Sequence, residues 1–407
     1  MDRTGRTMST RGQRIAVILG TRPEYLKLAP VIAELGRVGH RVETEVIFTG
    51  QHKELLVGLS DLFELRQSKQ LAVNNARPNL PGLTSALISA LDGEFCREKY
   101  HAVVVQGDTT TAFCAALTAF YHHIPVAHVE AGLRTGNLGE PYPEELNRQL
   151  VGRMAHWHFV PTVAAQKNLL QEGVSPASID MTGNTIIDTL HYVRDRKTPA
   201  DYEQSLLKED APELAEVMEK YRAMNGKTLA VLTIHRRENH GPKLEEFFRM
   251  MGRLAAAYPD HHIVYPYHLN PEVRLKAFQF MAEIPNIHLI APLSYRPFLY
   301  LMSCVDFALS DSGGLQEEFP SFGKPLLVLR DVTERPELIR AKMGKLVGVE
   351  PDEVYAEAGR LIEHARAGTH PDWFVPGPNP FGDGLASERI VSRLLHDLVP
   401  ISGLVEL

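Results

Sequence analysis

Two short apolar runs joined by one helical segment constrain this chain more than any other feature. Ala102 to Val105 and Pro125 to Val129 are bounded and rich in β-branched residues, which is typical of buried strands. Between them, Thr109 is placed to cap a helix that runs to about Tyr121. Two consecutive strands joined by one helix form a right-handed crossover and run parallel. The stretch 101–149 therefore predicts an α/β fold built on a parallel sheet.

Acidic side chains follow both of these strands. Asp108 comes after the first strand and Glu130 directly after the second, and Glu144 and Arg148 follow further along the chain. In open α/β sheets, ligands bind at the edge where the carboxyl ends of the strands meet. An isolated acid is more often a helix cap or the partner of a surface lysine, but like charges gathered at one edge shift each other's pKa. The set predicts an acid/base site.

The length of 407 residues is too great for one ordinary core, so we expect two domains. Strands and helices alternate in the second half as they do in the first. We predict a disordered leader at 1–13, a Rossmann-like domain at 14–190 and a second Rossmann-like, nucleotide-binding domain at 191–384. The amphipathic segment within 385–407 is expected to return to the first domain.

Composition excludes several classes of protein. A hydrophobic content of 44% and a charged content of 23% are typical of a globular chain, and no apolar run reaches the roughly 18 residues of a membrane span. The net charge of −7 argues against nucleic acid as a partner. The three cysteines show no metal or redox spacing, which favours a reducing cytoplasm. We expect no metal and no cofactor.

Three further strand ends carry ligand-binding patterns. The first predicted strand leads into a glycine turn and a helix start with Arg22 and Lys27, a pattern typical of an anion site. In the second half, the charged and titrating residues 235–239 follow a strand and predict ligand contact. Residues 311–314, Asp-Ser-Gly-Gly, let a phosphate approach backbone amides, and Glu318 suits ribose hydroxyls, so this segment predicts nucleotide binding.

Eight segments taken together resemble the non-hydrolysing bacterial UDP-N-acetylglucosamine 2-epimerases. They span nearly the whole chain: GTRPEYLKLAP at 20–30, QGDTTTAF at 106–113, HVEAGLRTG at 128–136, PEELNRQ at 143–149, HRREN at 235–239, YHLNP at 267–271, DSGGLQEE at 311–318 and RDVTERPE at 330–337. Hydrolysing relatives carry a different sequence around the central glutamate, so the third and fourth segments favour the non-hydrolysing type.

The resemblance implies a GT-B-like architecture, with two doubly wound domains facing each other across a central cleft, and a homodimer. Carried over by motif, the acid/base carboxylates are Asp108, Glu130 and Glu144, supported by Arg148 and His235. The UDP contacts are Arg22, Ser312, Gly313, Gly314 and Glu318. Some members bind a second UDP-N-acetylglucosamine as an activator, and the matching residues are Gln51, Arg77, Arg236 and His268. Glu54 stands where activated members often have glutamine, which sets this chain apart from that pattern.

The activity implied by the resemblance is reversible epimerisation of UDP-N-acetylglucosamine to UDP-N-acetylmannosamine in polysaccharide biosynthesis. UDP is eliminated, a 2-acetamidoglucal forms, and UDP adds again. Three alternatives stay open at this point. A hydrolysing epimerase would release free N-acetylmannosamine, a retaining GT-B glycosyltransferase would need an acceptor groove, and a nucleotide-sugar sensor would need no general base.

Overall fold

The chain divides into two compact units by its internal contacts. The structure, a computed structural model, describes residues 12–50, 68–73, 79–196, 207–223, 227–236, 239 and 241–398. Unit 1 comprises Met1–Thr189 and Gly382–Leu407, and unit 2 comprises Leu190–Phe381. Gln51 and Arg77 of the predicted activator site lie outside the described residues, as do positions 1–11 of the predicted leader. Gln13, which we assigned to that leader, is instead the first residue of a strand.

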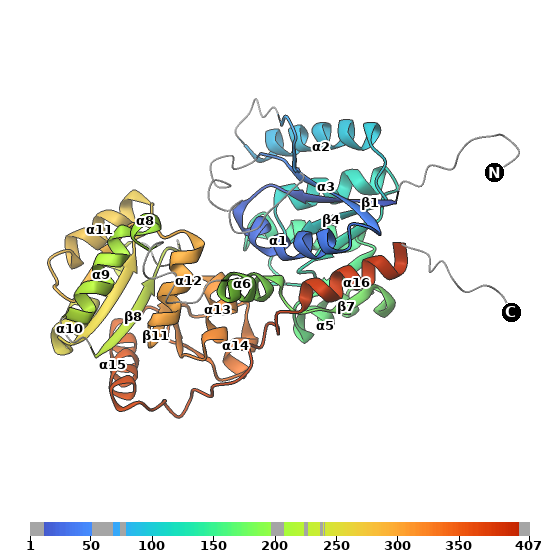
Figure 1. Cartoon of the computed structure of the whole chain (residues 1–407). Helices are drawn as coiled ribbons and strands as arrows, with labels where there is room; N and C mark the ends of the chain where they lie inside the picture. Colours follow the sequence, from blue (N-terminus) through green and yellow to red (C-terminus); the bar gives the residue numbers. More distant parts are fainter. Residues whose placement is uncertain are drawn as a thin grey trace, which may run out of the picture. The chain divides into compact units, whose positions relative to one another are not determined.

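Unit 1 is built on a seven-stranded parallel sheet in the order β3-β2-β1-β4-β5-β6-β7 (Figure 1). Its strands are β1 (Gln13–Leu19), β2 (Val42–Phe48), β3 (Ser68–Gln70), β4 (Ala102–Gln106), β5 (Val126–Val129), β6 (Trp157–Val160) and β7 (Ile179–Met181). Its helices are α1 (Arg22–Arg37), α2 (Leu80–Arg97), α3 (Thr110–Tyr121), α4 (Glu144–Met154), α5 (Val163–Gln171), the 3-10 turn η2 (Pro176–Ser178), α6 (Thr185–Arg196), which spans the division between the units, and α16 (Ala386–Leu398).

Unit 2 repeats the same strand order in a six-stranded parallel sheet, β10-β9-β8-β11-β12-β13. Its strands are β8 (Thr228–Thr233), β9 (His261–Pro266), β10 (Ile287–Ile290), β11 (Phe307–Ser310), β12 (Leu326–Val328) and β13 (Gly344–Leu346). Its helices are α8 (Leu207–Asp210), α9 (Pro212–Ala223), α10 (Pro242–Ala257), α11 (Pro271–Met281), α12 (Tyr295–Cys304), α13 (Gly313–Glu318), the 3-10 turn η5 (Phe319–Phe322), α14 (Pro336–Arg340) and α15 (Pro351–Ala367). Counted within each unit, both sheets follow the Rossmann order 3-2-1-4-5-6. The prediction of two doubly wound α/β domains is confirmed.

The core of unit 1 forms where α2 and α3 pack on the central strands. Every residue of β4 is buried, as expected for a parallel strand covered on both faces. The predicted cap of the following helix is confirmed, because the Thr109 hydroxyl accepts the amide of Ala112 at 3.0 Å. The helix α16 lies beside α1 (Figure 1). Its start is fixed by Asp188, which accepts the amide of Ser387 at 2.7 Å.

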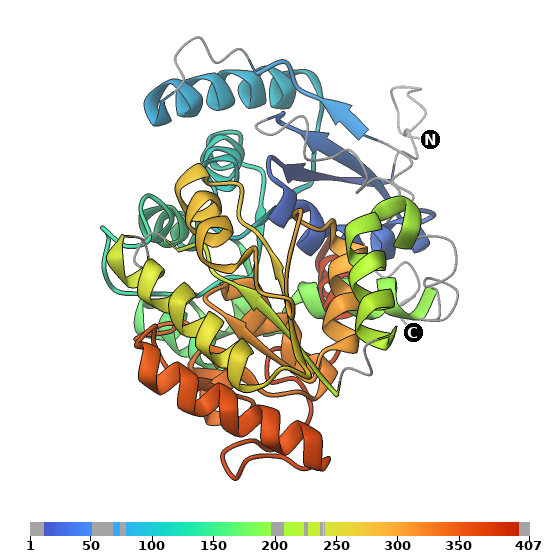
Figure 2. The same cartoon turned by 90° about the vertical axis from the view of Figure 1, so that its left-hand side faces the viewer.

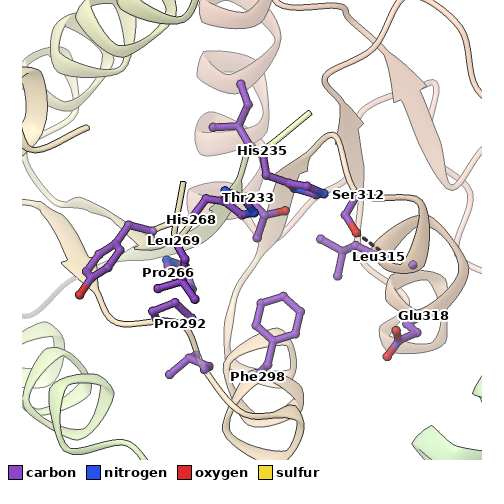
Figure 3. Close-up of a pocket in the computed structure, with 14 residues that line it drawn as sticks. Thr233, His235, Pro266, His268, Leu269, Pro292, Phe298, Ser312, Leu315 and Glu318 are labelled. Atoms are coloured by element: carbon purple, nitrogen blue, oxygen red, sulfur yellow. Dashed lines mark hydrogen bonds between the residues drawn. The ribbon is translucent and has the colours of Figure 1, made fainter. Parts of the chain in front are cut away.

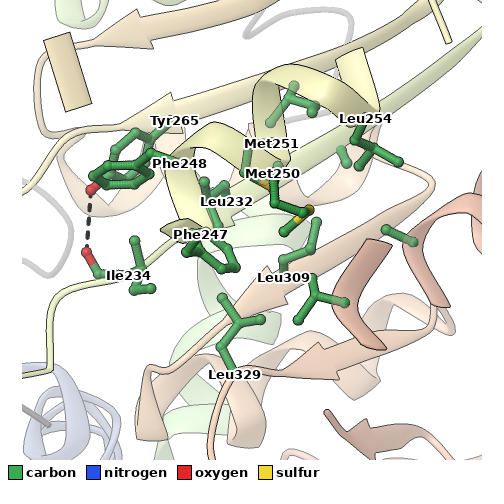
Figure 4. Packing of buried hydrophobic residues seen from close by; sticks show 14 of the residues in the cluster. Leu232, Ile234, Phe247, Phe248, Met250, Met251, Leu254, Tyr265, Leu309 and Leu329 are labelled. Carbon is green, nitrogen blue, oxygen red and sulfur yellow. Dashed lines mark hydrogen bonds between the residues drawn. The ribbon is translucent and has the colours of Figure 1, made fainter. Parts of the chain in front are cut away.

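The core of unit 2 lies between the sheet and the helices α10, α11 and α15. Figure 2 shows α10 and α15 running beside each other, and their apolar faces meet over β8, β9 and β11. Phe247 and Phe248 of α10 are fully buried in this cluster (Figure 4). Each such side chain contributes about 1.5–3 kcal/mol of burial free energy. Tyr265 satisfies its buried hydroxyl by donating to the carbonyl of Ile234 at 3.2 Å, which ties β9 to the segment leaving β8.

Candidate active site

The edge of the unit 1 sheet brings Asp108 and Glu130 onto neighbouring positions. Gln106 at the end of β4 pairs with Val129 at the end of β5, and the Gly107 amide donates to the Val129 carbonyl at 3.0 Å. The segments that follow β4 and β5 therefore leave the sheet side by side. Glu130 has a φ of +63°, a left-handed conformation that is uncommon outside glycine. Strain of this kind is found preferentially at functional sites.

Glu130 is a buried carboxylate held by side-chain donors from three elements. Only 8% of the residue is exposed. Lys27 of α1 contacts one carboxylate oxygen at 2.5 Å, Asn184 donates to the same oxygen at 3.4 Å, and Gln106 donates to the other. We predicted Lys27 as part of an anion site together with Arg22. In the structure its ammonium group neutralises and orients Glu130, whereas Arg22 is the first residue of α1.

Asp108 is held by the helix that carries the third predicted carboxylate. Arg148 of α4 forms an ion pair with the Asp108 side chain, and Asn147 donates to the Asp108 carbonyl at 2.9 Å. Glu144 is the first residue of this helix and is partly exposed. The structure therefore connects Arg148 directly to Asp108, and it places Glu144 one helical turn before this ion pair.

The neighbouring Glu145 has a structural role. It is fully buried and accepts the amides of Thr135 at 3.0 Å and Gly136 at 3.3 Å. Burial raises the pKa of Glu145, but these bonds, with the side chains of Gln149 and Arg148, outweigh it and hold the pKa below its ordinary value. Of the two adjacent glutamates, Glu145 anchors the loop before α4 and Glu144 keeps its access to solvent.

Sequence reasoning missed a further buried carboxyl beside this edge, that of Glu24. Glu24 accepts the amides of Gly20 at 3.1 Å and Thr21 at 2.8 Å, so it closes a capping box at the start of α1. Its other oxygen accepts the Thr109 hydroxyl at 2.7 Å. Burial raises the pKa of Glu24 to about 7, although these hydrogen bonds act in the opposite direction. This side chain therefore ties the helix carrying Lys27 to the cap that follows Asp108.

Unit 2 holds a cavity of about 350 Å³ at the carboxyl ends of its strands (Figure 3). This volume lies within the 300–1,000 Å³ usual for small-molecule sites. Most of the lining is apolar or aromatic, and a few polar groups converge on it. The residues are Thr233, Ile234, His235, Pro266, Tyr267, His268, Leu269, Pro292, Leu293, Phe298, Ser312, Gly314, Leu315 and Glu318.

Asp311, which we did not single out as a site residue, organises the segment after β8. It is fully buried, and one oxygen accepts the amides of His235 at 2.9 Å and Arg236 at 2.8 Å. The other lies 2.9 Å from Nδ1 of His235. Burial raises the pKa of Asp311, but the hydrogen bond and charge of His235 outweigh it and keep the pKa below its usual value. His268 stacks on His235 with ring centres 5.5 Å apart. The predicted catalytic His235 and the predicted activator-site His268 therefore line one cavity.

Residues of the Ser-Gly-Gly segment face two different surroundings, the cavity and the side chain of Arg335. Ser312 caps α13 through its hydroxyl, which accepts the Leu315 amide at 3.4 Å, and Gly314 lines the cavity. Gly313 instead faces Arg335, since a Cβ added there would lie 3.0 Å from the guanidinium carbon. Glu318 reaches the cavity and accepts the Tyr295 hydroxyl at 2.9 Å.

Two Rossmann-like units, one with carboxylates at its sheet edge and one with a small-molecule cavity, define a GT-B-like enzyme of the nucleotide-sugar class. The model of the UDP-N-acetylglucosamine 2-epimerase family matches residues 37–395. The chain belongs to this family, as the motifs predicted.

Curated relatives and solved structures are similar over nearly the whole chain. The chain is 42% identical to the UDP-N-acetylglucosamine 2-epimerase of Bacillus subtilis over 94% of its length and 95% of the relative's. A crystal structure of the Neisseria meningitidis enzyme bound to UDP-GlcNAc is 39% identical, with a TM-score of 0.82, over 94% of this chain and 100% of that one. A Methanocaldococcus jannaschii structure in complex with UDP-GlcNAc and UDP is 30% identical, with a TM-score of 0.73, over the same shares.

Proposed function

We propose that this chain interconverts UDP-N-acetylglucosamine and UDP-N-acetylmannosamine by inverting carbon 2 of the sugar, without hydrolysis. The observation that carries this proposal is the pair of carboxylates at the ends of β4 and β5. Asp108 and Glu130 follow adjacent strands, and each is held by its own cation. Inversion of a carbon–hydrogen centre needs proton carriers on two faces, and two oriented carboxylates meet that need.

The chemistry begins with loss of UDP. The proton on carbon 2 is not acidic while carbon 1 is a saturated acetal. When the bond from carbon 1 to the UDP oxygen breaks, the oxygen keeps the electron pair and positive charge develops at carbon 1. A carboxylate then removes the carbon 2 proton, and the electrons of that bond form the double bond of 2-acetamidoglucal. Proton return to the opposite face and addition of UDP to carbon 1 complete the inversion.

The residues of unit 1 serve the proton transfers in this proposal. Asp108, Glu130 and Glu144 supply the carboxyl groups. Lys27 fixes Glu130 at 2.5 Å, and Arg148 holds Asp108 through its ion pair. Each cation therefore fixes the position of one of the two carboxylates.

The residues of unit 2 serve the nucleotide. Glu318, oriented by Tyr295, is proposed to bind the ribose hydroxyls, and the backbone at Ser312 and Gly314 borders the diphosphate. His235 acts with the diphosphate as UDP leaves. Gly313 supports this loop through its packing with Arg335, and Arg22 of unit 1 supplies a further cation for the departing charge.

Regulation, assembly and location complete the proposal. UDP-N-acetylglucosamine is proposed to act also as an activator through Arg236 and His268, and the stacking of His268 on His235 supports a link between the two roles. We propose a homodimer that works in the cytoplasm in polysaccharide biosynthesis.

No helix among the described residues is long and apolar enough to cross a membrane. The three cysteines are free, as a reducing compartment requires.

Proton NMR of the purified protein with UDP-N-acetylglucosamine in heavy water tests the reaction. We expect deuterium at carbon 2 and a growing UDP-N-acetylmannosamine signal, because the returning proton comes from solvent. Free N-acetylmannosamine with UDP would indicate the hydrolysing reaction instead. UDP binding without exchange or a new sugar would contradict the proposal and favour a transferase or a sensor.

A further inference from the structure

One group of metal-ligating side chains in the described parts of the chain lies away from the predicted reaction site. Asp92 and Cys96 stand one turn apart on α2, and His122 directly follows α3. Positions four apart on a helix share a face, so both α2 side chains point the same way. The carboxylate, thiol and imidazole donor atoms all lie within 4.8 Å of one another.

Two of the donor distances in this group are close to those of a tetrahedral zinc site. With zinc–ligand bonds of 2.0–2.3 Å, tetrahedral ligand atoms stand roughly 3.3–3.6 Å apart. Here Nε2 of His122 lies 2.8 Å from Oδ1 of Asp92, and Sγ of Cys96 lies 4.0 Å from the same oxygen. Both distances differ from that range by about half an ångström or less, which side-chain rotations can supply. A thiolate and a carboxylate also balance the charge of a divalent cation.

The packing around the cluster orders its histidine before any metal binds. The ring of Phe95 meets the His122 ring edge-on with centres 5.8 Å apart, and the His122 side chain is only 23% exposed. The His122 amide donates to the Thr118 carbonyl at 3.1 Å, which fixes the backbone at the end of α3. The Asp92 side chain is 60% exposed, and its only ion-pair partner among the described residues is His122. Cys96 is exposed, so the site is open to an ion from solvent.

We infer that Asp92, Cys96 and His122 form a zinc-binding site that joins α2 to α3, with water as the fourth ligand. Cys and His ligands together select zinc over magnesium or calcium, which prefer oxygen. The site is separate from the proposed reaction, because α3 has 12 residues and places His122 about 18 Å from the helix start that follows Asp108. The ion clamps the two helices that cover the core of unit 1.

The test measures metal binding directly and needs no activity assay. Tag-free, reduced full-length protein is titrated with zinc against a chelating indicator, and with cobalt while the thiolate-to-metal charge-transfer absorption is recorded. We expect one zinc per chain and a cobalt–thiolate band. Cys96→Ser should abolish the band, and both Cys96→Ser and His122→Gln should weaken zinc binding at least ~10-fold.

Cys304→Ser is the matched control, because this thiol lies in unit 2 and outside the cluster. It should bind zinc as the wild type does and keep the cobalt–thiolate band. Cys96 is exposed and His122 is partly buried, so circular dichroism checks that both ligand variants are folded. A wild type without the cobalt–thiolate band, or equal zinc affinity in the wild type and both ligand variants, would overturn the inference.

Discussion

The two sheets share one topology but carry different chemistry at their edges. In unit 1, the strand ends bear carboxylates neutralised by nearby cations, Lys27 on Glu130 and Arg148 on Asp108. In unit 2, the strand ends border an open cavity, and the acidic side chain after β11, Asp311, is buried behind it. The same backbone edge can thus carry carboxylates paired with cations or border a cavity, depending on whether its acidic side chains meet cations or accept the backbone amides of a loop.

The two units also differ in the pKa of a buried carboxyl that accepts the backbone amides of a loop. Glu24 in unit 1 and Asp311 in unit 2 each accept two backbone amides at a strand end. Burial raises the pKa of Glu24 to about 7, because its other partners are neutral hydroxyls. Burial also raises the pKa of Asp311, but the hydrogen bond and charge of the His235 imidazole outweigh it, and the pKa lies below its ordinary value. The partner decides the direction, since desolvation is common to both.

The largest effect is expected from Asp108 and Glu130, the cation-paired carboxylates of unit 1. Asp108→Asn and Glu130→Gln should lower turnover ~10²–10⁴-fold, because a neutral amide cannot accept the proton. UDP affinity should stay near that of the wild type. Turnover by coupled assay and UDP affinity by calorimetry check this, with Glu388→Gln, an exposed carboxylate of unit 1, as the control. An equal loss of turnover and UDP affinity would contradict the proposal that unit 1 transfers protons and unit 2 binds the nucleotide.

The next effect concerns stability and pH at Glu24. Because its folded pKa is raised from 4.5 to about 7, its stabilisation is full below pH 4.5 and is lost as pH rises through 7. Glu24→Gln stays neutral and imitates the protonated form. Relative to wild type, its free energy of unfolding should therefore improve by about 3 kcal/mol between pH 4.5 and 7.5.

Urea unfolding across that pH range measures the difference, and Glu388→Gln should show none. The pH dependence expected from Asp311 has the opposite sign, because its pKa is lowered in the folded state. Its contribution to stability is present above the unfolded pKa and is lost as pH falls. A Glu24→Gln curve parallel to wild type would show that folding does not raise the pKa of Glu24, and the contrast with Asp311 would disappear.

A smaller effect is expected at Glu318, the cavity carboxylate of unit 2. Glu318→Gln removes charge-assisted bonds to the ribose, so UDP affinity should fall ~10–100-fold. Turnover at saturating substrate should change only a few-fold, which is the reverse of the result for Asp108→Asn. Calorimetry with UDP and saturation kinetics separate the two readouts. Glu337→Gln, in the same unit, is the control, and unchanged UDP affinity in Glu318→Gln would refute the ribose contact.

The smallest effect is expected at Tyr295, which orients Glu318 through its hydroxyl. Tyr295→Phe removes one hydrogen bond and should weaken UDP binding ~2–10-fold. The double variant with Glu318→Gln should be no weaker than Glu318→Gln alone, because both act through the same contact. Additive losses would mean that the tyrosine touches the ligand by another route. Tyr355→Phe on α15 serves as the control.

Much of the fold was predictable because its signals are local. The apolar runs at β4 and β5, the cap at Thr109 and the amphipathic helix at Ala386–Leu398 all follow from neighbouring residues. The strand starting at Gln13 was missed by one residue, since a polar first position in a strand looks like a leader. Motifs at the strand ends likewise predicted residues of the candidate site.

The parts that were not predictable depend on contacts between distant segments. Lys27 meets Glu130 across 103 positions, and Glu24 meets Thr109 across 85. Asp92 and Cys96 become a metal-ligating group only when α3 brings His122 beside them, so no spacing rule for cysteines finds it. The difference in burial between Glu144 and Glu145 also cannot be read from the sequence, because it depends on how the helix packs.

The return of α16 to unit 1 has a consequence for the order in which the protein is made. Unit 1 buries Ile390 and Leu394 of this helix, so it stays incomplete until the ribosome has passed through all of unit 2. At roughly 5–20 residues per second, that interval is on the order of ten seconds or more. During it, the face of α1 that α16 covers is exposed. Vectorial synthesis therefore lets unit 2 fold first, and a segment made after unit 2 completes the unit that was begun first.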